Sequence, residues 1–289
     1  MAYWAKNGTQ KLNSLSIGKS WQSANTCASW RITNDNNVQR LNGSHWESLD
    51  IFSNLEILQL SVGYCWWSAT TPEVWFLARA TGNAGGPGPY SVYRWNGSGF
   101  DCKGPLPFND TPTSITVGYG GVYVLGTSYQ SPANTAVQNI YGWATSDLGV
   151  TGEWVFVAWG LAHLSNICSG YIRGKGTTTP VLYVLLSQKE DGSGKVFQSK
   201  FENWCWQPWQ ELSGQSLTQL NAICEDSPVG VDSSGKVYSW ENNQWTQLVS
   251  TPPHPHMKVV NPPLTTVTEQ YSTIIYGVDS NGQEWIYSN

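Results

Sequence analysis

The feature that most constrains the fold of this sequence is a short segment that recurs along the chain. Each of the five copies starts with Leu or Ile and continues with Ser, Thr or Cys, and four of them end in Gly. A segment that returns at intervals of this size is typical of repeat architectures, in which each copy marks one structural unit. The copies are LSIG (15–18), LSVG (60–63), ITVG (115–118), ICSG (167–170) and ICED (223–226).

Each unit continues with further segments that are rich in β-forming residues. A second strand such as VWFLAR (74–79), a third such as VYRW (92–95) and a Trp-led fourth such as NNQWTQL (242–248) are separated by Gly, Asn and Ser turns. The third strand recurs six times, so the 289 residues divide into units of about 48, the size of a propeller blade. The pattern therefore predicts an all-β protein, a six-bladed β-propeller of four-stranded antiparallel blades.

The last unit lacks its Trp-led strand. The chain opens with AYWAKNGTQKL (2–12), a Trp-containing segment that precedes the first LSIG. We expect this N-terminal segment to supply the missing outer strand, because the pairing removes an exposed sheet edge and holds both ends of the chain in one sheet. Residues 1–289 then form a single β-propeller domain closed by its N-terminal strand.

The composition excludes several classes of protein. Lys and Arg total 15 against 20 Asp and Glu, a net charge of −5, which argues against nucleic-acid binding because that function needs a basic face. The 17 Trp and 14 Tyr argue against a disordered chain. No apolar run approaches the roughly 18 residues of a membrane-spanning helix. We therefore expect a soluble protein with no nucleic-acid partner and no transmembrane segment.

The N-terminal residues show no basic segment followed by an apolar one, the mark of a secretory signal. We therefore expect a cytoplasmic location, and a secreted form whose signal has been removed stays open. The cysteines lie far apart, without a C-x-x-C pair or a zinc spacing, so we interpret them as reduced thiols that are mostly buried. No cofactor and no metal site is expected. The six cysteines are Cys27, Cys65, Cys102, Cys168, Cys205 and Cys224.

The combination of these motifs resembles a known family. The L-x-(I/V)-G segments, the V-W and V-Y strands and the W-x-x-L outer strands together look like the tectonin-type β-propeller lectins, and more distantly like fungal fucose-lectin propellers. The resemblance covers the whole chain through short, degenerate motifs. It implies glycan binding at several sites between blades and, in fungi, a cytoplasmic defence role. The repeated Arg and Glu pair of the fucose lectins is absent, so the resemblance does not extend to fucose specificity.

Two third-strand arginines are candidate sugar-binding residues. They occupy equivalent positions in VQRLNGS and VYRWNGS, each before an Asn-Gly-Ser turn. A guanidinium fork and a turn amide can bind neighbouring hydroxyls while an indole covers the apolar face of a sugar ring. An exposed, structural Arg is the competing interpretation. The predicted sites comprise Arg40, Asn42 and Trp46 in the first unit, and Arg94, Trp95 and Asn96 in the second.

The remaining tryptophans divide into two groups. At the repeated position, Trp46, Trp154, Trp209 and Trp245 are more simply explained by packing between neighbouring blades. Other indoles fall outside the repeat, and for them a sugar platform, an oligomer interface and loop packing all stay open. A homo-oligomer is therefore one of the expected states. These further candidate residues are Trp66 and Trp67 after the second repeat segment, and Trp204 and Trp206 in NWCWQPW.

Taken together, these patterns favour a multivalent, non-enzymatic lectin for neutral, methylated or N-acetylated sugars, with glycans or glycoconjugates as partners. A propeller that binds protein partners is the alternative. A sialidase-like glycoside hydrolase is a weaker one, because TSDLGVTGEW (145–154) is a single imperfect Asp-box match and the chain has only five arginines. No opposed pair of carboxylates of the kind that glycoside hydrolysis uses stands out. We therefore expect no catalytic residues.

Overall fold

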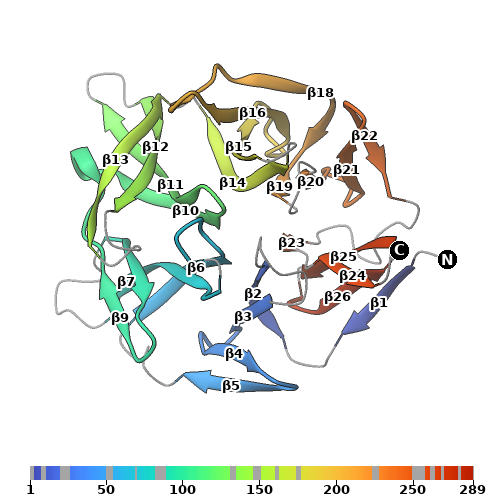
Figure 1. Ribbon diagram of the computed structural model, residues 1–289, viewed down its shortest axis with the longest axis horizontal. Coiled ribbons are helices and arrows are strands. Elements are labelled where there is room, and N and C mark those ends of the chain that lie inside the picture. The colour runs from blue at the N-terminus through green and yellow to red at the C-terminus, as the bar shows by residue number, and fades with distance from the viewer. Residues whose placement is uncertain are drawn as a thin grey trace.

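A computed structural model of the chain describes residues 3–7, 11–19, 27–49, 55–68, 70–81, 89–130, 135–145, 151–159, 163–173, 177–222, 228–248, 258–260, 264–267, 270–278 and 281–288. Within these ranges the strands form six antiparallel sheets that stand around a common centre (Figure 1). A short 3-10 helix, η2 (Pro107–Asn109), precedes the third sheet. Among the described residues no helix is long and apolar enough to cross a membrane.

Five sheets follow the four-stranded pattern, which confirms the expected β-propeller with four-stranded antiparallel blades. The first two blades contain β2 (Leu12–Lys19), β3 (Cys27–Thr33), β4 (Val38–Asn42) and β5 (His45–Leu49), then β6 (Leu55–Gly63), β7 (Glu73–Ala80), β8 (Ser91–Trp95) and β9 (Phe100–Cys102). The third contains β10 (Thr111–Gly118), β11 (Gly121–Gln130), β12 (Thr135–Thr145) and β13 (Gly152–Trp159). The fourth contains β14 (Leu164–Arg173), β15 (Thr178–Ser187), β16 (Gly194–Glu202) and β17 (Cys205–Trp206), with β18 (Gln210–Leu217) also paired to β16. The fifth contains β19 (Gln219–Ala222), β20 (Pro228–Val231), β21 (Val237–Glu241) and β22 (Gln244–Gln247).

The sixth sheet joins the two ends of the chain. β1 (Tyr3–Asn7) pairs with β26 (Glu284–Ser288), with Tyr3 opposite Ser288. β26 pairs in turn with β25 (Gln270–Val278), which also pairs with β23 (Lys258–Val260) and β24 (Leu264–Val267). The expected pairing of the N-terminal strand with the last unit is therefore confirmed, and Figure 1 shows the two termini side by side. This sheet departs from the four-strand order of the other five.

The fifth unit begins earlier than the repeat predicts. β19 spans Gln219–Ala222, and residues 218–221 line the centre of the ring in the way that residues 13–16 and 58–61 do. ICED (223–226), which the repeat assigned to this strand, lies outside the described residues. The assignment was wrong because Ile-Cys matched ICSG by residue type, whereas Leu220 occupies the position that Leu15 and Leu60 occupy in the ring.

The apolar cores lie in the seams between neighbouring blades. The Leu or Ile that starts each repeat segment packs into the seam with the preceding blade: Leu60 contributes to the core between blades one and two, and Ile115 to the core between blades two and three. Burial of one such side chain stabilises the fold by about 1.5–3 kcal/mol. Leu15, Ile167 and Leu220 occupy the equivalent places.

The hydroxyl of the repeat segment joins its blade to the next one. The backbone N–H of Val62 donates to Ser16 Oγ at 3.0 Å, and that of Val117 donates to Ser61 Oγ at 3.0 Å. In the next seam, the Ser169 N–H donates to Thr116 Oγ1 at 3.1 Å. The Ser or Thr after Leu or Ile is thus a hydrogen-bond acceptor between blades. Cys168 stands at this position in β14.

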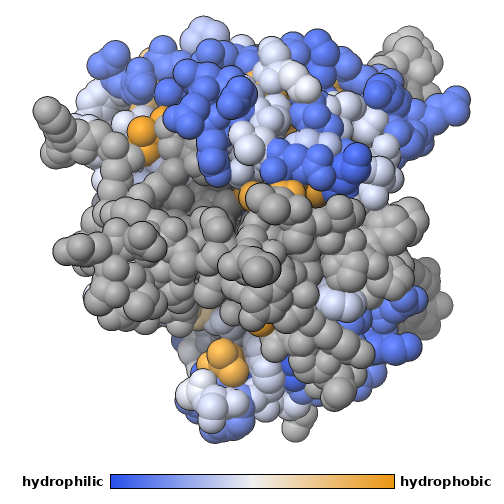
Figure 2. Space-filling model, turned by 90° about the vertical axis from the view of Figure 1, so that its right-hand side faces the viewer, coloured by the Kyte–Doolittle hydropathy of each residue, from blue (hydrophilic) through white to orange (hydrophobic). Residues whose placement is uncertain are grey.

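The Trp at the repeated outer position also packs between blades, as expected. Trp46, Trp154, Trp209 and Trp245 each contact the core of the seam with the preceding blade. Two of them are fixed by their indole N–H, because Trp154 Nε1 donates to Lys103 O at 3.1 Å and Trp245 Nε1 donates to Leu212 O at 3.0 Å. Outside these seams, the described surface on the flank that carries the termini is mainly hydrophilic (Figure 2).

The described cysteines are free thiols of two kinds. Cys65 and Cys168 are buried, and Cys102 and Cys205 are exposed. Burial raises the pKa of the Cys65 and Cys168 thiols well above its usual value, so both stay protonated and neutral. The side chain of Cys27 and the whole of Cys224 lie outside the described part of the chain.

Candidate functional site

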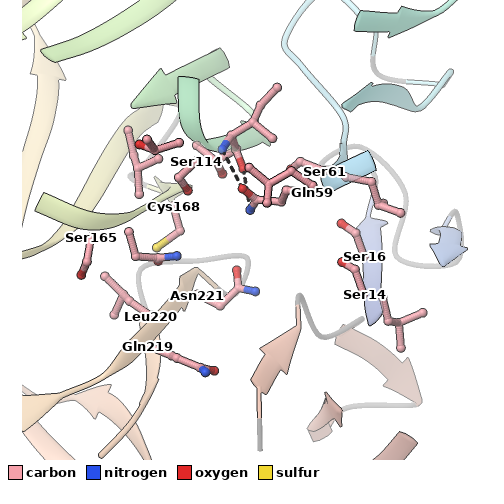
Figure 3. A pocket seen from close by; sticks show the side chains of 18 of the residues that line it. Ser14, Ser16, Gln59, Ser61, Ser114, Ser165, Cys168, Gln219, Leu220 and Asn221 are labelled. Atoms are coloured by element: carbon pink, nitrogen blue, oxygen red, sulfur yellow. Dashed lines mark hydrogen bonds between the residues drawn. The ribbon is translucent and has the colours of Figure 1, made fainter. Parts of the chain in front are cut away.

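The inner strands of the blades enclose a cavity of about 360 Å³ at the centre of the ring (Figure 3). Its walls come from β2, β6, β10, β14 and β19 with the residue before it, and from Val278 of β25. Small-molecule sites in proteins have volumes of about 300–1,000 Å³. The cavity therefore lies at the small end of the range for a ligand site.

A β-bulge at the same place in four inner strands shapes the rim of this cavity. The register shifts between Leu12 and Ser14, and shifts at the equivalent points of β6, β10 and β14. A bulge inserts one residue that has no partner on the adjacent strand and changes the direction of its side chain. The inserted residues are exposed and line the cavity; they are Asn13, Leu58, Thr113 and Ser165.

Polar side chains form the next level of the wall. Gln59 is fixed by two hydrogen bonds to the neighbouring strand, since its Nε2 donates to Ile115 O at 3.2 Å and its Oε1 accepts from the Ile115 N–H at 3.0 Å (Figure 3). Two other polar side chains beside the cavity each have an atom that makes no such hydrogen bond. Ser114 Oγ and Asn166 Oδ1 are buried beside the cavity without a hydrogen-bond partner among the described residues. Buried polar atoms normally have a partner, so these two atoms have capacity for a bound molecule.

The side chains that line the cavity in the described part of the chain are neutral. Hydroxyls and amides predominate, aliphatic groups fill the spaces between them, and Cys168 adds a protonated thiol. Such a wall offers both donors and acceptors without a fixed charge. The hydroxyl and amide residues are Asn13, Ser14, Ser16, Gln59, Ser61, Thr113, Ser114, Thr116, Ser165, Asn166, Thr218, Gln219 and Asn221.

The glycines of the repeat segment lie where adjacent inner strands touch. A Cβ atom on Gly18 would lie 2.8 Å from the backbone of Val62 and Gly63, so a side chain does not fit there. Gly63 meets the backbone of Val117, and Gly118 meets Ser169, at even closer range. The repeated glycine is therefore required by the direct backbone contact of adjacent inner strands. A contact this close leaves no room for any other residue.

The first predicted sugar site lies on the outer part of blade one, away from the cavity. Arg40 Nε donates to Glu47 Oε2 at 2.8 Å, and both side chains are more than a third exposed. Trp46 packs on the seam core under the Arg31 guanidinium, which lies 4.1 Å from the ring centre. Asn42 is exposed at the end of β4. These residues share one blade without enclosing a pocket with the inner strands.

The second predicted site is built around a buried ion pair. Arg94 binds Glu73 through two hydrogen bonds, Nε to Oε2 at 2.8 Å and Nη2 to Oε1 at 3.0 Å. The hydrogen bonds that Arg94 donates to Glu73 raise the pKa of Arg94. Trp95 packs edge-on against Trp30, and Asn96 closes its own turn by accepting from the Ser98 and Gly99 N–H groups. The Arg94 guanidinium thus forms an ion pair with a carboxylate of its own blade.

The two further indole pairs differ in exposure within each pair. Trp66 is 57% exposed and meets Trp67 edge to face at 5.5 Å, while Trp67 packs on the core between blades two and three. Trp204 is 93% exposed at a turn with φ of 65°, and Trp206 packs against Tyr123. In each pair, therefore, one indole is accessible to solvent and the other is held by packing against the protein.

None of the ten predicted site residues lines the central cavity. The sequence analysis concentrated on Arg and Trp and read the repeat segment only as a strand signal. The missed signal is in that segment, because Ser16, Ser61 and Thr116 share one repeat position, and Ser14, Gln59 and Ser114 share the position two residues earlier. A polar residue that recurs in the inner strand of every blade marks the wall of the ring's centre.

No family model matches the chain, and no curated protein matches its sequence. Solved structures do match its fold. The sialidase of Trypanosoma rangeli in complex with the inhibitor DANA aligns with TM-score 0.56 at 10% identity, over 97% of this chain and 55% of its own. The α-L-arabinofuranosidase of Fusarium graminearum in complex with an iminosugar inhibitor gives 0.55 at 9% identity, over 98% and 94%. A fungal lectin, the six-bladed Aleuria aurantia lectin, gives 0.48 at 14%, over 89% and 80%.

These matches correct one expectation. The sequence analysis concluded that the protein is not an enzyme, but a sialidase and an arabinofuranosidase share its fold. That conclusion was wrong because a single imperfect Asp box, few arginines and no evident carboxylate pair in the sequence do not exclude an enzyme on this fold. A propeller brings residues from separate blades to one centre, so catalytic groups need no common motif. Residues 146–150, which belong to the imperfect Asp-box match at 145–154, lie outside the described residues.

Proposed function

We propose that the protein binds carbohydrate in its central cavity and acts as a lectin of the tectonin type. The observation that carries this proposal is the wall of the cavity, which presents neutral hydroxyl and amide groups from five blades around about 360 Å³. A sugar presents many hydroxyls that both donate and accept, so it needs such a wall. Propellers of the same fold bind sugar-like compounds, as the iminosugar complex of the arabinofuranosidase illustrates.

The charge of the cavity wall determines which class of glycan fits the cavity. An ionised ligand group enclosed without an opposite charge loses its hydration and gains no ion pair in return. The lining residues that the structure describes contain no Arg, Lys, Asp or Glu. Neutral or N-acetylated sugars therefore fit this cavity better than sialylated or sulfated ones.

The Trp66 and Trp67 pair supports a second glycan site of the inter-blade type. Trp66 is accessible, and Trp67 fixes its orientation from the seam of blades two and three. An exposed indole held by packing is suited to cover the apolar face of a sugar ring. Two sites on one chain would strengthen attachment to a surface that bears many glycans. The proposal also takes the sixth sheet, which carries both termini, as the sixth blade of the ring.

A protein-binding propeller is the second candidate function. The observation that favours it is Trp204, 93% exposed at the tip of the hairpin that joins β16 to β17. Exposed indoles are enriched at protein interfaces. Recovery of a stoichiometric protein partner that free sugars do not displace, and that Trp204→Ser releases, would favour this function over the lectin.

The test begins with a glycan array, followed by calorimetric titration of the strongest binder. Asn13→Trp narrows the rim of the cavity and should weaken that titration at least about tenfold, or 1.4 kcal/mol. Gln247→Trp adds the same indole on the exposed face of β22 and should leave binding unchanged. Binding that survives Asn13→Trp would move the site to Trp66 and Trp67. Hydrolysis of 4-nitrophenyl glycosides by the intact protein would replace the lectin with a glycosidase.

A further inference from the structure

We infer that the sugar in the central cavity binds through two neighbouring hydroxyls to the seam between blades three and four. The inference rests on the proposed function and specifies which groups of the sugar and which side of the cavity make the contact. It follows from one repeat position that lines the cavity in successive blades. Gln59 holds this position in blade two, Ser114 in blade three and Asn166 in blade four.

Gln59 shows what an inner strand binds at this level. Its carboxamide crosses the seam to β10 and binds both backbone groups of Ile115, donating from Nε2 to the carbonyl oxygen at 3.2 Å and accepting from the N–H at Oε1 at 3.0 Å (Figure 3). The N–H and C=O of one residue leave an antiparallel strand on the same side. A group that donates and accepts side by side can therefore bind both.

The next seam has the same backbone groups but a shorter side chain. The Ser169 N–H donates to Thr116 Oγ1 at 3.1 Å, so this edge of β14 faces blade three. Alternate residues of a strand share one direction, and the N–H and C=O of Ile167 therefore face blade three as well. Ser114 stands opposite them, and its Oγ is buried without a hydrogen-bond partner among the described residues. Ser114 and Ile167 both line the cavity, so a ligand can take the place that a glutamine carboxamide takes one seam earlier.

Other hydroxyls of the wall already have partners in the protein. Those of the repeat segments, such as Ser16 and Ser61, accept from backbone N–H groups of the following blade. Those at or before the bulges donate to backbone carbonyls, namely Thr113 to Leu125 O, Ser165 to Leu185 O and Thr218 to Val231 O. The unpartnered atoms Ser114 Oγ and Asn166 Oδ1 thus distinguish the side of blades three and four.

Two hydroxyls on adjacent carbons suit this place. One can donate to Ile167 O while the other accepts from the Ile167 N–H, as the two ends of the Gln59 carboxamide do at Ile115. An acetamido group cannot replace them, because its amide is secondary and trans, with the N–H and the C=O pointing in opposite directions. The contact therefore selects a neutral sugar with two free neighbouring hydroxyls over one that is N-acetylated or O-methylated there.

The first test uses the wild-type protein and modified sugars. Methyl glycosides of common hexoses are titrated by calorimetry, and the tightest binder is compared with its derivatives that carry one additional methyl ether at each ring hydroxyl in turn. Derivatives modified at two neighbouring positions should each bind at least about tenfold more weakly, because a methyl ether cannot donate and is too bulky for the seam. Full affinity of every derivative, or losses at positions that are not neighbours, would overturn the inference. If no methyl glycoside binds, the proposed function fails, and this inference with it.

The variant Ser114→Gln tests the seam itself. Its carboxamide should bridge to Ile167 as Gln59 bridges to Ile115, so the affinity for the methyl glycoside should fall at least about tenfold without a lower melting temperature. Ser213→Gln makes the same change at an exposed position of β18 and should bind like the wild type. Wild-type affinity in a folded Ser114→Gln variant would overturn the inference and leave the proposed function standing. If the variant does not fold, the methylated series decides.

Discussion

Blades one and two carry an arginine at the same repeat position, and the two side chains have different environments. Arg40 on β4 pairs with Glu47 on the adjacent strand β5, and the two side chains are 37% and 39% exposed. Arg94 on β8 pairs with Glu73 on β7, and here the exposures are 13% and 4%. Glu73 also accepts from Trp75 Nε1 at 3.0 Å, which completes a buried network. Equivalent positions in a repeat thus share backbone geometry, while the surroundings set what the side chain does.

The difference arises from the partner strand. Glu47 follows Arg40 by seven residues across one hairpin turn, so both side chains face solvent on the outer edge of the blade. Glu73 begins β7, on the inner side of Arg94, and is buried beside Trp75 of the same strand. Burial removes the solvent screening that makes exposed ion pairs weak. The Arg94 pair is therefore part of the core, and the Arg40 pair is a surface contact.

The largest effect is expected from Arg94→Ala. The variant leaves the Glu73 carboxylate buried without its cation, so the free energy of unfolding should fall by about 3–5 kcal/mol. Urea denaturation followed by tryptophan fluorescence measures this loss. A smaller loss in the double variant Arg94→Ala with Glu73→Gln would confirm that the unpaired charge is the cause. A change too small to measure in the single variant would contradict the contrast between the two blades.

A smaller effect is expected from Arg94→Lys. Lysine keeps the charge but cannot form the two parallel hydrogen bonds that Nε and Nη2 of Arg94 make with Glu73. The loss of a hydrogen bond between charged groups should cost about 1.5–3 kcal/mol. The matched variant Arg40→Lys should leave the denaturation midpoint unchanged. Equal midpoint shifts in both variants would mean that geometry matters no more in the buried pair than in the exposed one.

Arg40→Ala should have little effect on stability. Exposed ion pairs are screened by water and often contribute nothing measurable. The denaturation midpoint should therefore stay within error of the wild type, which makes this variant a clean probe of glycan binding at the outer face of blade one. A reduced affinity for an array-selected glycan with unchanged stability would place a ligand contact at Arg40. Unchanged affinity would remove Arg40 from the binding residues.

The smallest effect is a pH dependence in blade one. The hydrogen bond from Arg40 lowers the pKa of Glu47 below its usual value. A carboxyl group with a depressed pKa in the folded state contributes stability above its unfolded pKa of about 4.3, and loses it as the pH falls through the folded value. NMR titration should therefore show a higher pKa for Glu47 in Arg40→Ala than in the wild type. An unchanged or lower pKa in the variant would contradict the assigned cause.

The sequence was informative about the ring and much less so about its centre. Alternating β-forming segments and the Trp-led strands predicted the blades, and the missing last strand predicted the pairing of β1 with β26. The rim could not be predicted, because the bulged residues Asn13, Leu58 and Thr113 share no residue type and a bulge depends on register. The buried pair of Glu73 and Arg94 was equally hidden, since the two residues are 21 apart in sequence and meet only when β7 and β8 pair.

The pairing of β1 with β26 has a consequence for the order of events during synthesis. Tyr3 leaves the ribosome 285 residues before Ser288, yet the two are partners in one ladder. Chains are made at about 5–20 residues per second, so β1 waits many seconds for its neighbour while the intervening blades form one after another. During that interval its unpaired edge is open to strands of other chains. We therefore expect slow translation of the segment between β1 and β26 to favour aggregation, with chaperone binding to nascent β1 reducing it.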